Sequence, residues 1–296
     1  MNSESDTAPH HIPVMVSEVI SLLDIHPDGI YLDGTIGLGG HAKQILSKLS
    51  LNGRIIGIDL DEEALDICRK NLHASSSVSL FRASYSAFPQ ILARAGVSTV
   101  NGILLDLGFS SLQLDSKMRG FTYSCDGPLD MRFSSRGTIT AEELIHNTSE
   151  KELARIIWEY GEERYSRRIA KYLKLAKRIS SVSELKEAIR RCTPPNHRNR
   201  TYARVFQALR IAVNNELEQL KRFLDIFIDY LEIGGRIVIL SYHSLEDRLV
   251  KLKFRELKQK GQVLILTKKP LRPAAAEIQA NRRSRSAKLR AAERIA

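Results

Sequence analysis

Three short apolar runs that each end at an aspartate constrain the fold of this 296-residue chain more than any other feature. The runs are residues 29–33, 54–59 and 102–106, and a glycine-rich loop at 34–40 follows the first of them. Apolar runs of this length, bounded by turn residues, predict buried β-strands. Helical patterns separate the runs, and strands that alternate with helices predict a doubly wound parallel sheet.

The remaining apolar patterns extend this alternation. In the first part of the chain they predict helices at 41–49, 61–72 and 88–95 and a strand at 78–82. In the last part they predict helices at 215–231 and 245–260 and strands at 236–241 and 262–266. Residues 284–295 fit either a basic helix or a last strand that runs in the reverse direction.

The middle of the chain interrupts the alternation. Residues 110–136 are rich in Gly, Ser and Asp and predict a loop, whereas residues 140–214 predict a series of helices. The clearest helical patterns are 141–146, 151–160, 164–176 and 183–191, with a break at Pro194-Pro195. We therefore expect one α/β domain, made of residues 1–115 and 215–296, interrupted by a helical insertion at 116–214.

The composition is that of a globular protein without an evident metal site. Hydrophobic residues make up 43% and charged residues 27% of the chain, and no apolar run is long enough to cross a membrane. The first nine residues are polar, unlike a secretory signal. Cys68, Cys125 and Cys192 are far apart and the histidines form no HExxH pattern, so we expect neither disulfides nor a bound metal. Reduced thiols favour a cytoplasmic location.

Positive charge is concentrated away from the N-terminal part of the chain. The net charge is +11 overall, but residues 1–60 hold three Lys/Arg against seven acids. Residues 161–210 hold fourteen Lys/Arg against four acids, and residues 281–296 hold six against one. A solvated helix face explains one basic run, whereas segregation on this scale favours a surface that binds nucleic acid. Within it, Arg190, Arg191, Arg198 and Arg200 surround the Pro194-Pro195 break and are the favoured RNA contacts.

The glycine-rich loop predicts a nucleotide site and leaves its ligand open. Glycines between a strand and a helix let a ligand approach backbone N–H groups, and Asp59 at the tip of the next strand is placed to bind ribose hydroxyls. Gly37-x-Gly39-x-x-Ala42 also fits the loose NAD pattern. A methyltransferase, an NAD(P) enzyme and a non-enzymatic nucleotide binder are therefore all compatible with the loop.

Three further features favour a methyltransferase. Asp33 stands at the mouth of the loop, where it would repel a pyrophosphate but suit the ammonium group of adenosylmethionine. The basic insertion suits a large anionic substrate. The strand at 102–106 continues into Asp106-Leu-Gly-Phe109, an acid and an aromatic residue where a target base would meet the methyl donor. Phe109 fits a stacking role and a core role equally well.

At these residues the chain resembles the RsmH (MraW) family, whose members methylate N4 of a cytidine in small-subunit (16S) ribosomal RNA. The resemblance runs nearly end to end and implies a class I (Rossmann-like) adenosylmethionine-dependent methyltransferase sheet with an inserted all-helical domain. The motifs that support it are His11-Ile-Pro-Val, Tyr31-Leu-Asp-Gly-Thr-Ile-Gly-Leu-Gly-Gly-His41, Gly102-Ile-Leu-Leu-Asp-Leu-Gly108, Asp126-Gly-Pro-Leu-Asp-Met-Arg132, Phe206-Gln-Ala-Leu-Arg-Ile-Ala-Val-Asn214 and Ser241-Tyr-His-Ser-Leu-Glu-Asp-Arg248.

The resemblance implies the cofactor, the partner and most of the site. S-adenosylmethionine would be the methyl donor and small-subunit ribosomal RNA the partner. The implied contacts to the methyl donor are Gly39, Gly40, His41, Asp59, Tyr85, Asp106 and Gln113. The chain departs from the family at Tyr85, where the family usually has Phe, and at Phe109, where it usually has Val. The second departure weakens the stacking role of Phe109.

Asp106 and His243 are the candidate catalytic residues. The exocyclic amine of cytosine is a weak nucleophile because its lone pair is delocalised, and a hydrogen-bond acceptor beside the amine localises that pair. Asp106 offers such an acceptor, although it equally suits a role in cofactor binding. His243 is the second candidate, and a structural histidine paired with Glu246 or Asp247 is its alternative. Asp130 and Arg132 order the active-site loop or form a salt bridge.

Two other functions remain open. Methylation at C5 of cytosine needs a thiolate nucleophile, and Cys125 is the cysteine nearest the motifs. No neighbour in the sequence is placed to lower its pKa. An RNA-binding ribosome assembly factor with a vestigial cofactor pocket is the other alternative, and it would bind the cofactor without turnover.

Overall fold

The computed structural model describes residues 12–73, 75–116, 118–134, 139–176 and 178–296. It divides into two compact units, one made of the chain up to Gly108 together with Gln219–Ala296, and the other made of Phe109–Glu218. The second unit begins before and ends after the insertion expected at 116–214. Three features of the sequence lie outside the described residues: the polar first nine residues, His11 of the first family motif and Lys177 of the basic stretch.

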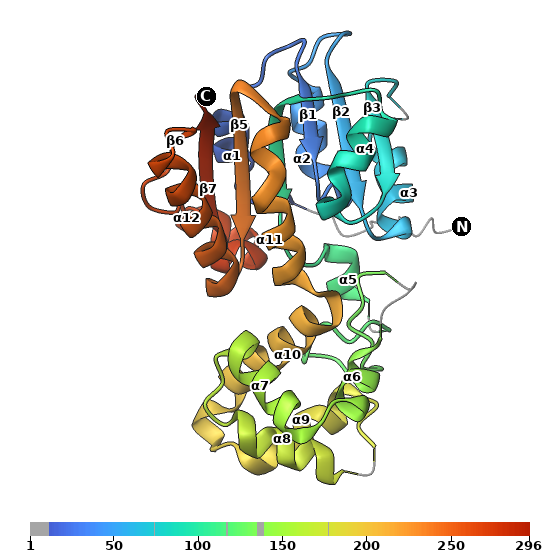
Figure 1. Ribbon diagram of the computed structural model, residues 1–296. Helices are drawn as coiled ribbons and strands as arrows, with labels where there is room; N and C mark the ends of the chain where they lie inside the picture. The colour runs from blue at the N-terminus through green and yellow to red at the C-terminus, as the bar shows by residue number, and fades with distance from the viewer. Residues whose placement is uncertain (1–11, 74, 117, 135–138, 177) are drawn as a thin grey trace, which may run out of the picture. The chain divides into compact units, whose positions relative to one another are not determined.

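The first unit is built on a seven-stranded sheet in the order β3-β2-β1-β4-β5-β7-β6 (Figure 1). Strands β1 to β5 are parallel, whereas β7 runs antiparallel to both β5 and β6. The reversed last strand is therefore the correct alternative for residues 284–295. The strands are β1 (Ile30–Asp33), β2 (Arg54–Asp59), β3 (Val78–Arg82), β4 (Val100–Asp106), β5 (Leu231–Ser241), β6 (Val263–Ile265) and β7 (Lys288–Arg294).

Helices cover both faces of this sheet because each strand is apolar on both sides. In β2, Ile56 and Ile58 pack on one face with α4, α11 and α12, whereas Ile55 packs on the other with α1, α2 and α3. Apolar burial on both faces is typical of parallel sheets. The helices are α1 (Val16–Leu23), α2 (Gly40–Leu46), α3 (Glu62–Asn71), η1 (Tyr85–Ala87), α4 (Phe88–Arg94), α11 (Glu216–Ile226), η3 (Phe227–Tyr230), α12 (Ser244–Gln259), α13 (Ala275–Ala280) and η4 (Arg282–Ser286).

The second unit is helical (Figure 1). It has its own apolar core. Two of its longer helices start at capping boxes, formed by Thr140 with Glu143 and by Ser181 with Glu184, in which each partner bonds the backbone of the other. Its elements are α5 (Ser111–Asp115), α6 (Ala141–Asn147), α7 (Glu150–Gly161), α8 (Ser166–Leu175), α9 (Val182–Cys192), η2 (Pro195–His197) and α10 (Arg198–Asn214).

The structure differs from the expectation in the segment 110–136. A short helix, α5, lies where a loop was predicted, and its capping box joins Ser110 and Gln113. The segment was misread because Gly, Ser and Asp dominate it, and five residues are too few to show helical periodicity. Among the described residues, no helix is both long and apolar enough to cross a membrane.

Candidate functional site

The glycine loop between β1 and α2 is fixed by the strands on either side of β1. The Gly34 N–H donates to the Leu104 carbonyl and the Ile36 N–H donates to the Ile58 carbonyl, and each bond is 3.0 Å long. Gly39, with φ of 84°, precedes α2 in the left-handed region that favours glycine. A Cβ at Gly39 would also lie 2.9 Å from the Cys68 sulfur. The loop therefore has no side chain at this bend, and α2 begins at Gly40.

Asp59 connects this loop to the end of β2. Its Oδ2 accepts the N–H of Gly37 and its Oδ1 accepts the N–H of Asp61, both at 2.9 Å. Burial raises the pKa of Asp59 to about 6, although these two backbone bonds favour its ionised form. A carboxylate oxygen can accept more than one hydrogen bond, so this geometry is compatible with the ribose contacts expected of Asp59.

Asp33 is the most strongly perturbed carboxyl group of the loop. Its side chain is buried, and Oδ1 accepts the Thr35 N–H at 3.2 Å. Burial, together with the charges of Asp106 and Asp59, raises the pKa of Asp33 to about 8. The ends of β1, β2 and β4 therefore form an acidic site in which a cationic ligand would favour the ionised form of Asp33.

Asp106, at the end of β4, is held by three side chains of the same unit. Its backbone N–H donates to Thr35 Oγ1 at 2.6 Å, and its Oδ1 accepts the hydroxyl of Tyr242 at 2.7 Å. Its Oδ2 lies 3.8 Å from His41 Nδ1. Burial and the charge of Asp106 raise the pKa of Tyr242 well above its ordinary value, so Tyr242 remains a hydrogen-bond donor.

His41 and Tyr85 complete the group of predicted residues in this unit. His41 is buried at the start of α2, and its Nε2 donates to the Val14 carbonyl at 2.8 Å, because a carbonyl can only accept. Tyr85 packs edge to face on Phe223, with ring centroids 5.8 Å apart. A Cβ at Gly34 would lie 3.1 Å from the Cβ of Tyr85, which places Tyr85 beside the loop.

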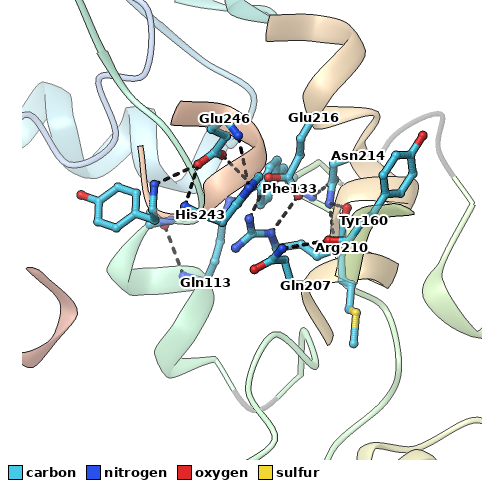
Figure 2. Close-up of polar contacts among 12 residues, drawn as sticks. Gln113, Phe133, Tyr160, Gln207, Arg210, Asn214, Glu216, His243 and Glu246 are labelled. Atoms are coloured by element: carbon cyan, nitrogen blue, oxygen red, sulfur yellow. Dashed lines mark hydrogen bonds and ion pairs between the residues drawn. The ribbon is translucent and has the colours of Figure 1, made fainter. Parts of the chain in front are cut away.

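His243 has a structural role as the N-cap of α12. Its Nδ1 accepts the Glu246 N–H at 3.4 Å, and its own N–H donates to Glu246 Oε2 at 3.3 Å. Its Nε2 lies 3.1 Å from Glu246 Oε1 (Figure 2). These contacts favour the alternative of a structural histidine, with Glu246 as its partner. Asp247 instead bonds Arg290 of β7 at 2.6 Å.

Gln113 and Phe109 belong to the helical unit. Gln113 is buried, and its side-chain oxygen accepts the Ser110 N–H at 3.0 Å in the capping box of α5. Phe109 packs on Phe121, and the guanidinium of Arg210 lies 5.0 Å from the centre of its ring. Phe109 therefore contributes to the core of the helical unit, which is the alternative to a stacking role.

Two buried or half-buried ion pairs order the helical unit. Arg210 bonds both carboxylate oxygens of Glu216, at 2.8 and 2.9 Å (Figure 2). Arg132 bonds both oxygens of Asp130, at 2.8 and 2.7 Å. Such two-point pairs fix the orientation of both side chains. The geometry of Asp130 and Arg132 thus fits a salt bridge that orders its own segment.

The cysteines differ in their fitness as nucleophiles. Cys68 lies behind the glycine loop, and burial raises the pKa of its thiol to about 12. It is therefore protonated at neutral pH and a poor nucleophile. Cys192 is buried in the helical unit, and burial raises its pKa as well. Cys125 is exposed, so it is the cysteine that remains available for C5 chemistry.

Sequence reasoning missed Thr35 and Tyr242. Both contact Asp106, and both are polar residues within motifs that the sequence displays. Tyr242 follows the end of β5, in which Leu240 pairs with Asp106 of β4. The hydrogen bond from Tyr242 to Asp106 can be expected only when β4 and β5 are known to be neighbours. Thr35 lies in a glycine-rich loop, whose sequence indicates contacts through the backbone and gives no signal for a role of the Thr35 hydroxyl.

The doubly wound sheet with a reversed last strand, and the carboxylates around its glycine loop, define a class I (Rossmann-like) methyltransferase. Residues 8–295 match the MraW methylase family, and the chain belongs to this family. Family membership decides against the NAD(P) enzyme that the loop alone left open.

Three similar proteins are each described as ribosomal RNA small subunit methyltransferase H. The protein of Kosmotoga olearia is 50% identical over 292 residues, covering 96% of this chain and 97% of its own length. That of Caldicellulosiruptor saccharolyticus is 44% identical and covers 96% of this chain and 99% of its own length. That of Thermosipho africanus is 47% identical and covers 96% and 98%.

Proposed function

We propose that this methyltransferase transfers a methyl group from S-adenosylmethionine to N4 of a cytidine in small-subunit ribosomal RNA. The observation on which the proposal depends most is the convergence of Asp33, Asp59 and Asp106 around a glycine-rich loop, in a chain of the MraW methylase family. The names of the similar proteins support the RNA substrate. The choice of N4 comes from the motif resemblance.

The residues of the site fit a cationic methyl donor. S-adenosylmethionine supplies a methyl group from a positively charged sulfonium centre and also has an ammonium group. Asp33 is buried and Asp59 is half-buried, and both have raised pKa values, so the ionised form of each gains from a nearby positive charge. Gly39 is the N-cap of α2, and Gly40 and His41 are its first residues, whose N–H groups have no partner within the helix. We assign these residues, with Tyr85, Asp106 and Gln113, to the binding of the donor.

Asp106 is the candidate acceptor for the target amine. Its Oδ1 is oriented by the Tyr242 hydroxyl, and its backbone is fixed by Thr35. A carboxylate held in this way can accept a hydrogen bond from an exocyclic amine and localise the amine lone pair. No strong base is needed, because the amine proton becomes acidic once the new N–C bond forms. His243 is engaged in the cap of α12 and is the weaker of the two catalytic candidates.

The direct test is mass spectrometry of nucleosides from small-subunit ribosomal RNA of cells with and without the gene. Loss of N4-methylcytidine supports the proposal, whereas loss of C5-methylcytidine supports the thiolate alternative. An unchanged nucleoside profile in cells whose protein binds S-adenosylmethionine supports the assembly factor with a vestigial pocket.

Two variants separate the chemistries in vitro. Asp106→Ala should reduce methyl transfer at least a hundredfold if the carboxylate takes part directly, as expected for removal of a residue that assists proton transfer. Cys125→Ser should retain most activity, because direct transfer needs no thiolate. An inactive Cys125→Ser enzyme that still folds and binds S-adenosylmethionine would overturn direct N4 transfer.

We also propose that the helical unit, together with part of the C-terminal segment, binds the RNA, while the sheet unit supplies most of the contacts to the methyl donor. The charge distribution supports this division, but not every basic residue is available. Arg290 of β7 is buried against Asp247, and Arg294 donates to the carbonyls of Ile228 and Leu231. Of the C-terminal segment, exposed Arg282 and Arg285 of η4 remain as candidate RNA contacts.

A further inference from the structure

Most basic side chains of the helical unit are engaged within the protein. Arg190 and Arg191 of α9 share the carboxylate of Glu187, at 2.5 and 3.0 Å. Arg178 pairs with Glu142 at 2.7 Å, and Lys174 donates to carbonyls at the end of α6. The cluster around Pro194-Pro195 is therefore partly neutralised, and so is much of the positive charge between residues 161 and 210.

Helix α8 instead has several basic side chains in a row that are not engaged. Arg167, Arg168 and Lys171 are exposed, and none of them forms an ion pair with another described residue. At 100° per residue they share one side of the helix, within an arc of about 100°. Ile169 and Leu173, on the opposite side, are buried in the apolar core of the unit. No acidic residue occurs in Ser166–Leu175, so this exposed side has uncompensated positive charge.

The start of α8 adds to this excess of positive charge. Its N-cap, Tyr165, makes no side-chain cap, and Arg167 and Arg168 occupy the first turn. Cations are unfavourable there because the helix dipole is positive at this end. Helices α6, α7 and α9 instead have glutamates in their first turns. Arg164, just before α8, stacks its guanidinium over the Tyr165 ring at 4.7 Å and extends the basic side.

We propose that the exposed side of α8, formed by Arg164, Arg167, Arg168 and Lys171, binds the phosphate backbone of the RNA substrate. The inference rests on the proposed RNA substrate and moves the principal contact from the Pro194-Pro195 break to α8. Charge complementarity selects this occupant, because a phosphate chain supplies several negative charges at once and releases counterions on binding. The packing of α8 against α7 and α9 holds the basic side chains on a rigid element.

The test compares two triple variants of the full chain that lose the same charge. In the first, Arg167, Arg168 and Lys171 are each changed to Gln. In the control, Arg178, Arg190 and Arg191 of the same unit are each changed to Gln. Binding to a 16S ribosomal RNA transcript is measured from about 50 to 200 mM salt, and binding of S-adenosylmethionine checks that each variant is folded.

We expect the α8 variant to bind the transcript at least tenfold more weakly at the lower salt concentration. The slope of log affinity against log salt should fall by about 2, since each contact with single strands contributes about 0.7. The control should change affinity less than threefold, because its arginines are already paired with glutamates. Affinity for S-adenosylmethionine should stay within about twofold in both variants, because distant sites act nearly independently.

The outcomes distinguish this inference from the proposed function. If the wild type methylates the RNA but the α8 variant binds it as tightly and with the same slope, the α8 assignment is wrong and the activity stands. The assignment is equally wrong if the control loses as much affinity as the α8 variant. If the wild type methylates no RNA while only the α8 variant loses RNA binding, the binding surface stands and the proposed activity is wrong.

Discussion

Replacement of Asp33 by Asn should stabilise the ligand-free protein, although Asp33 belongs to the proposed donor site. Burial raises the pKa of Asp33 from 3.8 to about 8, so at pH 7 the folded protein holds a proton that the unfolded chain has released. Because the folded state binds more protons, this group makes the free energy of unfolding fall as pH rises from about 4 to 8. The stability that protonation of Asp33 contributes is fully present below about pH 4.

The magnitude follows from the pH interval. At about 1.4 kcal/mol per pH unit, the interval between 3.8 and pH 7 corresponds to about 4 kcal/mol of lost stability. Asn cannot ionise, and its side-chain oxygen can still accept the Thr35 N–H. We therefore expect Asp33→Asn to raise the free energy of unfolding by about 2–4 kcal/mol at pH 7 and by much less near pH 4.

Urea denaturation of the ligand-free wild type and variant at pH 4.5, 7 and 8.5 measures this difference. Asp229→Asn is the matched control, because Asp229 is exposed on η3 and should change stability by less than about 0.5 kcal/mol. The reasoning is refuted if Asp33→Asn lowers stability at pH 7, or if its effect is the same at all three pH values. Either result would mean that Asp33 is ionised in the folded, ligand-free protein.

Two further substitutions test the site itself. Asp59→Ala should weaken S-adenosylmethionine binding at least tenfold in calorimetry, because hydrogen bonds to a charged group contribute about 1.5–3 kcal/mol each. Glu63→Ala on the exposed side of α3 is the control. Unchanged affinity of Asp59→Ala for S-adenosylmethionine, or tight NADH binding by the wild type, would contradict the assignment of Asp59. Tyr242→Phe removes the hydroxyl that orients Asp106. This variant should lower kcat about tenfold and leave the affinity for S-adenosylmethionine within about twofold. An unchanged kcat would show that the hydroxyl has no part in positioning Asp106.

The sequence predicts the sheet and the acidic edge of the site because both follow from local patterns. Asp33, Asp59 and Asp106 each end an apolar run, and the carboxyl ends of parallel strands meet at one edge of a sheet. The last strand was ambiguous because Lys288–Arg294 mixes basic residues with alanines. Its pairing with β5 and the bond between Arg290 and Asp247 decide the question, and both are contacts distant in sequence.

The contacts that sequence reasoning missed are those between neighbouring strands. The hydrogen bond from Tyr242 to Asp106 joins residues 136 positions apart, and no local pattern reports it. The RNA surface predicted around Pro194-Pro195 stays a prediction, but the free positive charge of this cluster is smaller than the sequence suggests. Charge counting treats every arginine alike, although the spacing of Glu187 from Arg190 and Arg191 already indicates i,i+3 and i,i+4 pairing.

The raised pKa of Asp33 and its proposed function have one physical origin. A carboxyl group buried beside two other acids destabilises the fold at neutral pH, because its ionised form has no positively charged partner. The same lack of positive charge would make the proposed site selective, since a pyrophosphate would add to the repulsion and a sulfonium or ammonium group would relieve it. Binding of a cationic donor at pH 7 should therefore drive release of the Asp33 proton, and Asp33→Asn should lose both that release and the affinity that accompanies it. The stability gained by Asp33→Asn and the donor affinity lost would then be two measurements of one carboxylate.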